Sequence, residues 1–206
     1  MQLIYIHGLE ADHTSVKGQW LADWCALHRP QIQVRRPNLN LPPEQVLAVL
    51  QQLIAVDPDS HVVGSSLGGF YATQCVARFG VRAVLVNPSV RPFVSMQRFF
   101  QQGQASHATS TGWVITPAQL DTLGQMFQPV PAHPERMLVL LQTGDEVLDY
   151  RQARDYYSQD GAQCPMLIER GGDHFMHDLQ DKIPLVVDFL FGRSGPARAG
   201  AQCRFG

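Results

Sequence analysis

The chain has 206 residues, of which 45% are hydrophobic and 17% are charged, and its formal net charge at pH 7 is -2. This length suits a single domain with its own core, and the absence of a basic excess argues against binding to nucleic acid or to a membrane surface. No apolar run approaches the roughly 18 residues of a spanning helix. The first residues lack the pattern of a secretory signal, which favours a cytoplasmic protein.

The four cysteines, at positions 25, 75, 164 and 203, form neither a CxxC pair nor zinc-knuckle spacing, so free thiols are expected. The stretch Asp173–Asp178 contains imidazole and carboxylate groups that suit a metal, but its spacing matches no zinc signature. The chain also lacks GxGxxG and P-loop motifs. We therefore expect no cofactor and no metal, and a small molecule as the partner.

Short β-branched runs alternate with helical patterns, which predicts an α/β fold with a parallel sheet between two layers of helices. The expected strands are Leu3–Ile6, Ile32–Arg35, His61–Val63, Ala83–Val86, Met137–Leu141 and Met166–Ile168. We expect these six strands to lie in the spatial order 2-1-3-4-5-6. Between the first two lies a helix whose buried face is predicted from helical spacing to contain Val16, Trp20, Trp24 and Leu27.

Four further helices are indicated by their boundary residues, over residues 42–56, 66–79, 149–157 and 184–190. Asp149, with Gln152 three residues later, is the predicted N-cap of the third of these. Pro184 is taken as the start of the last helix, because proline is favoured in a first helical turn.

The connection from Pro88 to Arg136 is too long for an ordinary loop and should contain structure of its own. We expect two helices that form a cap, separated by the polar stretch Gln101–Thr111. The predicted domain spans residues 1–192, with the cap inserted at about 88–136. Residues 193–206 show no periodicity and are expected to form a disordered tail.

The strongest chemical signal is Gly64-Ser65-Ser66-Leu67-Gly68, a GxSxG pattern between a predicted strand and a predicted helix. A serine on such a turn projects its hydroxyl outward, and the following helix N-terminus favours developing negative charge. Only Ser66 has glycines at both flanking second positions, so it is preferred over Ser65 as the nucleophile. An ordinary Ser- and Gly-rich turn that caps a helix is the alternative.

A serine hydroxyl is a weak nucleophile that needs a base and a group to orient that base. Asp145 follows the fifth predicted strand and His174 follows the sixth, in the Ser, Asp, His order of the α/β hydrolases. We predict a triad of Ser66, Asp145 and His174.

Each partner has competitors nearby. Glu146, Asp149 and Asp173 are the alternative acids, and His177 and His7 are the alternative bases. Asp149 is better explained as a helix cap, and Asp173 sits beside His174, where contact with its neighbour's ring is awkward.

The loop after the first strand, His7-Gly8-Leu9, stands where these enzymes hold the oxyanion. We predict an oxyanion hole made by the backbone amides of Leu9 and Leu67. A simple tight turn at His7-Gly8 is the alternative interpretation.

From about Leu3 to Gly192 the chain resembles the small bacterial YqiA-type esterases of the α/β-hydrolase superfamily. The resemblance rests on the stretches at residues 63–69, 86–92 and 142–153, which read VGSSLGG, VNPSVRP and QTGDEVLDYRQA. It implies a compact α/β-hydrolase fold without the superfamily's first two antiparallel strands, and cleavage of carboxylic esters or thioesters. Asp173 departs from relatives that often carry asparagine before the histidine, and the segment after Gly192 has no counterpart.

The sequence thus predicts a serine esterase or thioesterase that works through an acyl-enzyme intermediate. The alternative from another class is a non-catalytic protein that keeps this fold to bind a ligand or a partner. A complete triad argues against that alternative, since a binding protein has no need of all three residues.

Overall fold

A computed structural model describes residues 1–192 of the chain. A six-stranded parallel sheet forms its centre, with the strands in the order β2-β1-β3-β4-β7-β8. All six predicted strands are present, in the predicted spatial order: β1 (Gln2–Ile6), β2 (Gln33–Arg35), β3 (Ser60–Ser65), β4 (Ala83–Val86), β7 (Met137–Gln142) and β8 (Met166–Glu169). The predicted tail, residues 193–206, lies outside the described residues.

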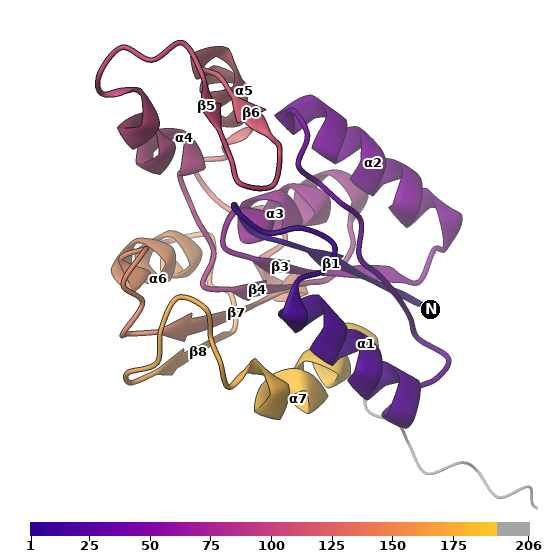
Figure 1. The fold of residues 1–206 in the computed structure, drawn as a ribbon. Coiled ribbons are helices and arrows are strands. Elements are labelled where there is room, and N and C mark those ends of the chain that lie inside the picture. The colour runs from indigo at the N-terminus through magenta and orange to yellow at the C-terminus, as the bar shows by residue number, and fades with distance from the viewer. Residues whose placement is uncertain (193–206) are drawn as a thin grey trace, which may run out of the picture.

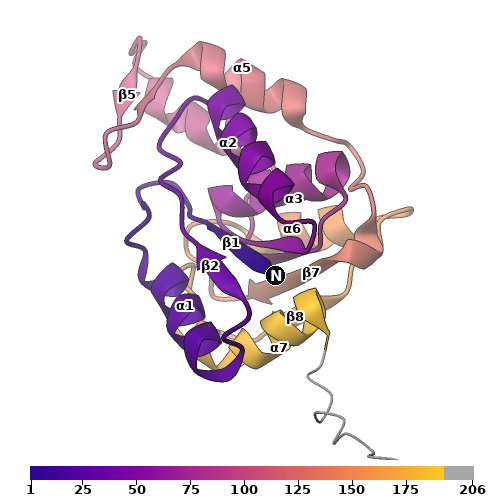
Figure 2. The same ribbon diagram turned by 90° about the vertical axis from the view of Figure 1, so that its right-hand side faces the viewer.

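Helices cover both faces of the sheet (Figures 1 and 2). α1 (Val16–His28) and α7 (Leu179–Phe191) lie on one face, and α2 (Pro43–Val56), α3 (Leu67–Phe79) and α6 (Tyr150–Ser158) lie on the other. Successive strand side chains point to opposite faces, so Ile4 and Ile6 join one core whereas Leu3 and Tyr5 join the other. Burial on both faces explains why the central strands are continuous apolar runs.

The buried face of α1 differs from the predicted one. The prediction is wrong for Val16 and Leu27, which are exposed, whereas Trp20 and Trp24 are half-buried and pack against the core. The helix instead buries Gly18, Leu21 and Cys25. A Cβ on Gly18 would lie only 2.7 Å from the Tyr5 ring, so the helix packs most closely on the sheet where its side chain is smallest.

α7 begins at Leu179, five residues before Pro184, so the predicted start of this helix is also wrong. A proline inside a helix removes a hydrogen bond and costs about 3 kcal/mol. Each apolar side chain that the helix buries contributes roughly 1.5–3 kcal/mol, and the buried set is Leu179, Ile183, Val186, Val187 and Leu190. Packing on the sheet therefore outweighs the local effect of the proline.

The segment between β4 and β7 lies at the top of the molecule in Figure 1. In place of a first cap helix it has the single turn α4 (Pro92–Ser95) and the 3-10 turn η1 (Met96–Phe100). An unpredicted antiparallel pair follows, β5 (His107–Ala108) and β6 (Val114–Ile115), and then the expected second helix α5 (Pro117–Met126) and the turn η2 (Pro134–Arg136). Strands of two residues are too short to leave a periodic signal.

Cys25, Cys75 and Cys164 are buried free thiols, and Cys203 lies outside the described residues. Within residues 1–192, none of the helices combines the length and the apolar character that a bilayer crossing needs.

Candidate active site

Ser66 occupies a sharp turn between β3 and α3, with φ 55° and ψ -119°. Residues with a Cβ rarely adopt this backbone conformation, and the GxSxG pattern is known for it. A Cβ on Gly64 would overlap the Gly68 carbonyl, and a Cβ on Gly68 would overlap the carbonyl of Ile6. The two glycines therefore allow β3, α3 and β1 to approach each other closely. Ser65, the rival nucleophile, is buried as the last residue of β3.

Side chains from three loops form a continuous chain of hydrogen bonds. His174 Nε2 lies 3.0 Å from Ser66 Oγ, and His174 Nδ1 lies 2.8 Å from Asp145 Oδ2. The Asp145 side chain is only 2% exposed, and its Oδ1 accepts hydrogen bonds from the amides of Val147 and Leu148 at 2.9 and 2.8 Å. A carboxylate held this way keeps the imidazole protonated on Nδ1, which leaves Nε2 to accept a proton from serine.

The competing residues make other contacts. Glu146 accepts a hydrogen bond from the backbone amide of His174 at 3.0 Å, so it holds the loop rather than the ring. Asp149 caps α6 as predicted, by accepting from an amide in the helix's first turn. Asp173 Oδ2 lies 2.6 Å from His177 Nδ1 on its own loop.

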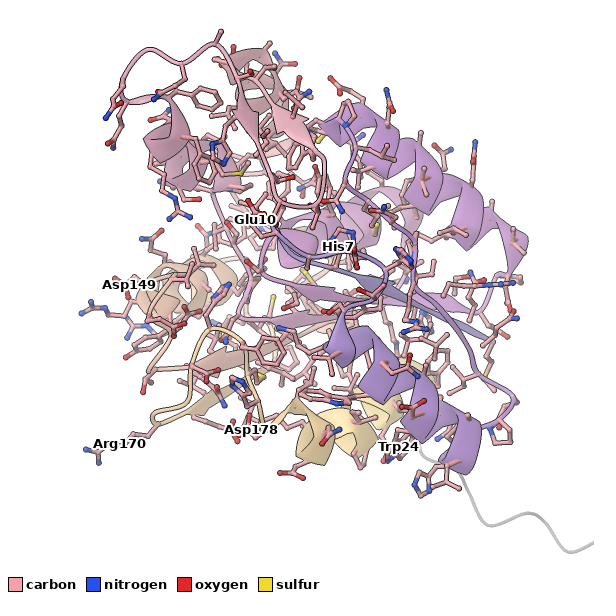
Figure 3. All side chains as sticks on the ribbon, viewed as in Figure 1. His7, Glu10, Trp24, Asp149, Arg170 and Asp178 are labelled. Carbon is pink, nitrogen blue, oxygen red and sulfur yellow. The ribbon has the colours of Figure 1, made fainter. Side chains whose placement is uncertain are left out.

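His7 fixes the loop after β1. Its Nε2 accepts from the Leu39 amide at 2.9 Å, so Nδ1 carries the hydrogen and donates to the Gly8 carbonyl at 2.9 Å. Burial lowers the pKa of His7, which favours this neutral form. Glu10, labelled with His7 in Figure 3, accepts from the Ser110 amide at 2.7 Å in the turn between β5 and β6. The cap segment is thus tied to the loop that carries Leu9.

A cavity of about 240 Å³ opens beside Ser66 and His174, and both Leu9 and Leu67 line it. Leu67 is the first residue of α3, so its amide has no acceptor within the helix. The cap contributes Pro92, Ser95, Met96 and Arg98 to the wall, and the loop after β7 contributes Val147 and Leu148. Four of the five predicted site residues therefore line one cavity, and the fifth, Asp145, contacts His174 from behind it.

Asn87 is a buried residue of the site that belongs to none of the catalytic motifs. Its Nδ2 donates to the carbonyls of Asp173 and His174 at 3.0 and 3.2 Å, and its Oδ1 accepts from the Gln142 amide at 3.0 Å. Asn87 therefore ties together the ends of β4 and β7 and the loop after β8. The only sequence signal for it is its place in the stretch VNPSVRP.

Across residues 1–192, no three His, Cys, Asp or Glu side chains converge as the ligands of a metal would. In the stretch considered for a metal, Asp178 pairs instead with Lys182, whose Nζ lies 2.6 Å from its Oδ2.

The sheet order and the serine turn at the end of β3 define an α/β-hydrolase fold. The solved structures that share this fold include the following three. Est1E from Butyrivibrio proteoclasticus matches with a TM-score of 0.70 at 12% identity, over 91% of this chain and 86% of that one. Alpha/beta hydrolase domain-containing protein 10 from mouse matches with a TM-score of 0.65 at 15% identity, over 91% and 89%. XC6422 from Xanthomonas campestris, described as an a/b serine hydrolase without lid, matches with a TM-score of 0.60 at 16% identity, over 94% and 84%.

The family of the chain is shown by a match to a family model rather than to a solved structure. The chain belongs to the uncharacterised protein family UPF0227, whose family model matches residues 2–191. This is the YqiA-type family that the sequence resembles, so the resemblance is confirmed.

Proposed function

We propose that this protein is a serine esterase or thioesterase that hydrolyses small carboxylic esters through an acyl-enzyme intermediate. The observation that carries the proposal is the chain of contacts from Ser66 Oγ through His174 to the buried Asp145, at 3.0 and 2.8 Å. A serine flanked by a base and an orienting acid is the arrangement that activates a hydroxyl for acyl transfer. Est1E, one of the proteins that share the fold, is described with bound ferulic acid, and LipS and LipT as lipolytic enzymes.

In the first half of the reaction, Ser66 Oγ attacks the carbonyl carbon while His174 Nε2 takes the hydroxyl proton. The carbonyl electron pair moves onto oxygen, and the amides of Leu9 and Leu67 donate hydrogen bonds to this oxyanion. Removing one such donor typically raises the barrier by about 2.7–4 kcal/mol. The tetrahedral intermediate then expels the alcohol or thiol, which receives the proton from His174, and the acyl group stays on Ser66.

In the second half, water replaces the leaving group. His174 Nε2 removes a proton from water as its oxygen attacks the acyl-serine, and the same amides hold the second oxyanion. Collapse of this intermediate releases the carboxylic acid and returns the proton to Ser66 Oγ. Throughout both halves Asp145 holds the imidazole by its Nδ1 hydrogen.

The cavity limits the size of the group that can be enclosed beside Ser66. Its volume of about 240 Å³ lies below the roughly 300–1,000 Å³ of pockets that hold drug-sized ligands. We infer that the group bound next to the reacting carbonyl is small.

The test is hydrolysis of a chromogenic ester series of increasing acyl length, with EDTA present, by the wild type, Ser66→Ala and Ser65→Ala. We expect a short-chain optimum, and a loss of more than about a thousandfold in kcat for Ser66→Ala alone. Fluorophosphonate should label the wild type and Ser65→Ala but not Ser66→Ala. Equal activity of Ser66→Ala and wild type would show that the nucleophile is another residue. A wild type that is folded, inactive and unlabelled would favour the ligand-binding alternative.

A further inference from the structure

Lys17 is a buried cation that the reaction above does not use. It lies in the first turn of α1 and is 7% exposed. Its Nζ donates to the backbone carbonyl of Phe175 at 2.8 Å and lies 4.3 Å from the centre of the Phe175 ring. Trp20, one turn along α1, meets the same ring edge-on at 6.0 Å between centroids. Lysine is rarely this buried without a specific partner, and its partner is the residue next to His174.

The loop that carries His174 has no regular structure, so its position depends on contacts from other elements. The side chain of Asn87 donates to two consecutive carbonyls, one of them that of His174 itself. Glu146 accepts from the His174 amide at 3.0 Å. Lys17 supplies the hydrogen bond to the next carbonyl, that of Phe175. The backbone is thereby held at Asp173, His174 and Phe175. Of these three anchors, only the one at Phe175 comes from the face of the sheet that α1 covers.

The charges of two carboxylates, Asp173 and Asp145, act on the ammonium. Burial lowers the pKa of Lys17 to about 8, and the charges of Asp173 and Asp145 oppose that shift. Lys17 is therefore mostly charged at neutral pH and loses its proton as the pH rises through about 8. His177, which packs against Phe175 at 4.5 Å between centroids, is the other titratable ring on this loop.

We propose that Lys17 is a positioning residue for His174, which holds the imidazole at its distance from Ser66 by anchoring the Phe175 carbonyl. This inference rests on the proposed function, because it assumes that His174 is the base. Lys17 does not line the cavity, so its loss should act on the chemical step rather than on substrate binding. A misplacement of about 1 Å at a reacting group can lower a rate about a hundredfold.

The experiment compares the wild type with Lys17→Met, which keeps an unbranched buried side chain, and with Lys17→Arg, which keeps the charge. Lys182→Met is the matched control, because Lys182 is also buried, at 8% exposed, but binds Glu169 and Asp178 instead. We expect Lys17→Met to lower kcat by about ten- to a hundredfold with KM within about twofold, and Lys17→Arg to restore part of that loss. Lys182→Met should keep the kcat of the wild type within a few-fold.

The pH profile is the readout that a merely structural role would not move. In the wild type kcat should fall as the pH rises through about 8, because the charge-assisted bond to Phe175 is lost. This fall in kcat at alkaline pH should be absent from Lys17→Met and should persist in Lys182→Met. In Lys17→Arg it should move above about pH 10, because the guanidinium stays charged. A folded Lys17→Met with the wild-type kcat, or with the same fall in kcat at alkaline pH, would overturn the proposal. If the wild type itself hydrolyses no ester, the proposed function fails instead, and this role of Lys17 fails with it.

Discussion

The backbone of Ser66 should be strained, and glycine should relieve that strain. Ser66→Gly and Ser66→Ala both lack the hydroxyl and its contact with His174, so they differ in the Cβ alone. At φ 55° and ψ -119° a residue with a Cβ is strained by about 1–3 kcal/mol. Glycine in place of alanine also lowers the free energy of unfolding by about 0.4–1 kcal/mol, because the unfolded chain has more conformational freedom. Near the middle of both ranges, the free energy of unfolding of Ser66→Gly should therefore exceed that of Ser66→Ala by about 1–2 kcal/mol.

Urea unfolding and thermal melting both measure this difference. For a chain of this size about 1 kcal/mol corresponds to about 2–4 °C, so Ser66→Gly should melt about 2–8 °C above Ser66→Ala. Ala26→Gly, at an exposed position of α1, is the control. It should lower the free energy of unfolding by about 1 kcal/mol, because glycine is unfavourable in an unstrained helix. If the control behaves so and Ser66→Ala is at least as stable as Ser66→Gly, the turn is not strained and the reasoning fails.

Three further changes have defined outcomes. Lys17→Met removes a lysine whose pKa falls from 10.5 to about 8 on folding, and with it the bond to Phe175, so the free energy of unfolding of the variant relative to the wild type should be most favourable at pH 7. The difference in free energy of unfolding in favour of Lys17→Met should shrink between pH 8 and 10, because native Lys17 has then released its proton whereas Lys17 in the unfolded chain has not. Urea titrations at both pH values measure it. Asp149→Ala removes the N-cap of α6 and should lower the melting temperature by about 2–4 °C, or about 1 kcal/mol, without changing kcat. Gly68→Ala should lower the free energy of unfolding by about 3 kcal/mol or more in urea, whereas Gly124→Ala, with space around its Cβ, should raise it by about 0.5–1 kcal/mol.

The sheet and the serine turn could be predicted because each rests on a local pattern. Burial on both faces makes the central strands continuous apolar runs, which stand out between helical patterns. Gly64 is required by contacts within one strand-turn-helix unit and Gly68 by the close approach of β1, and both stand at fixed positions around Ser66. Asp149 was predictable as a cap for the same reason, since its bond reaches only two residues along the chain.

What could not be predicted depends on contacts between distant segments. The face that α1 buries is decided by how closely Gly18 approaches Tyr5, which no helical spacing reports. The start of α7 is decided by its packing on the sheet, against the local signal of Pro184. Lys17 lies 158 positions from the carbonyl it binds, and an isolated lysine on a helix is normally a solvated residue.

The place of β8 at the edge of the sheet bears on how the protein is made. The serine turn needs only the strands around β3, which the ribosome produces early, whereas His174 arrives after the last strand, which pairs with β7 alone. A nascent chain that stops before Asp173 therefore carries Ser66 with no imidazole beside it. The proposed base can reach Ser66 only once β8 and the loop after it have been made and packed against the rest of the sheet. The order of synthesis thus leaves the Ser66 hydroxyl without its proposed base until nearly all of the described chain has been made.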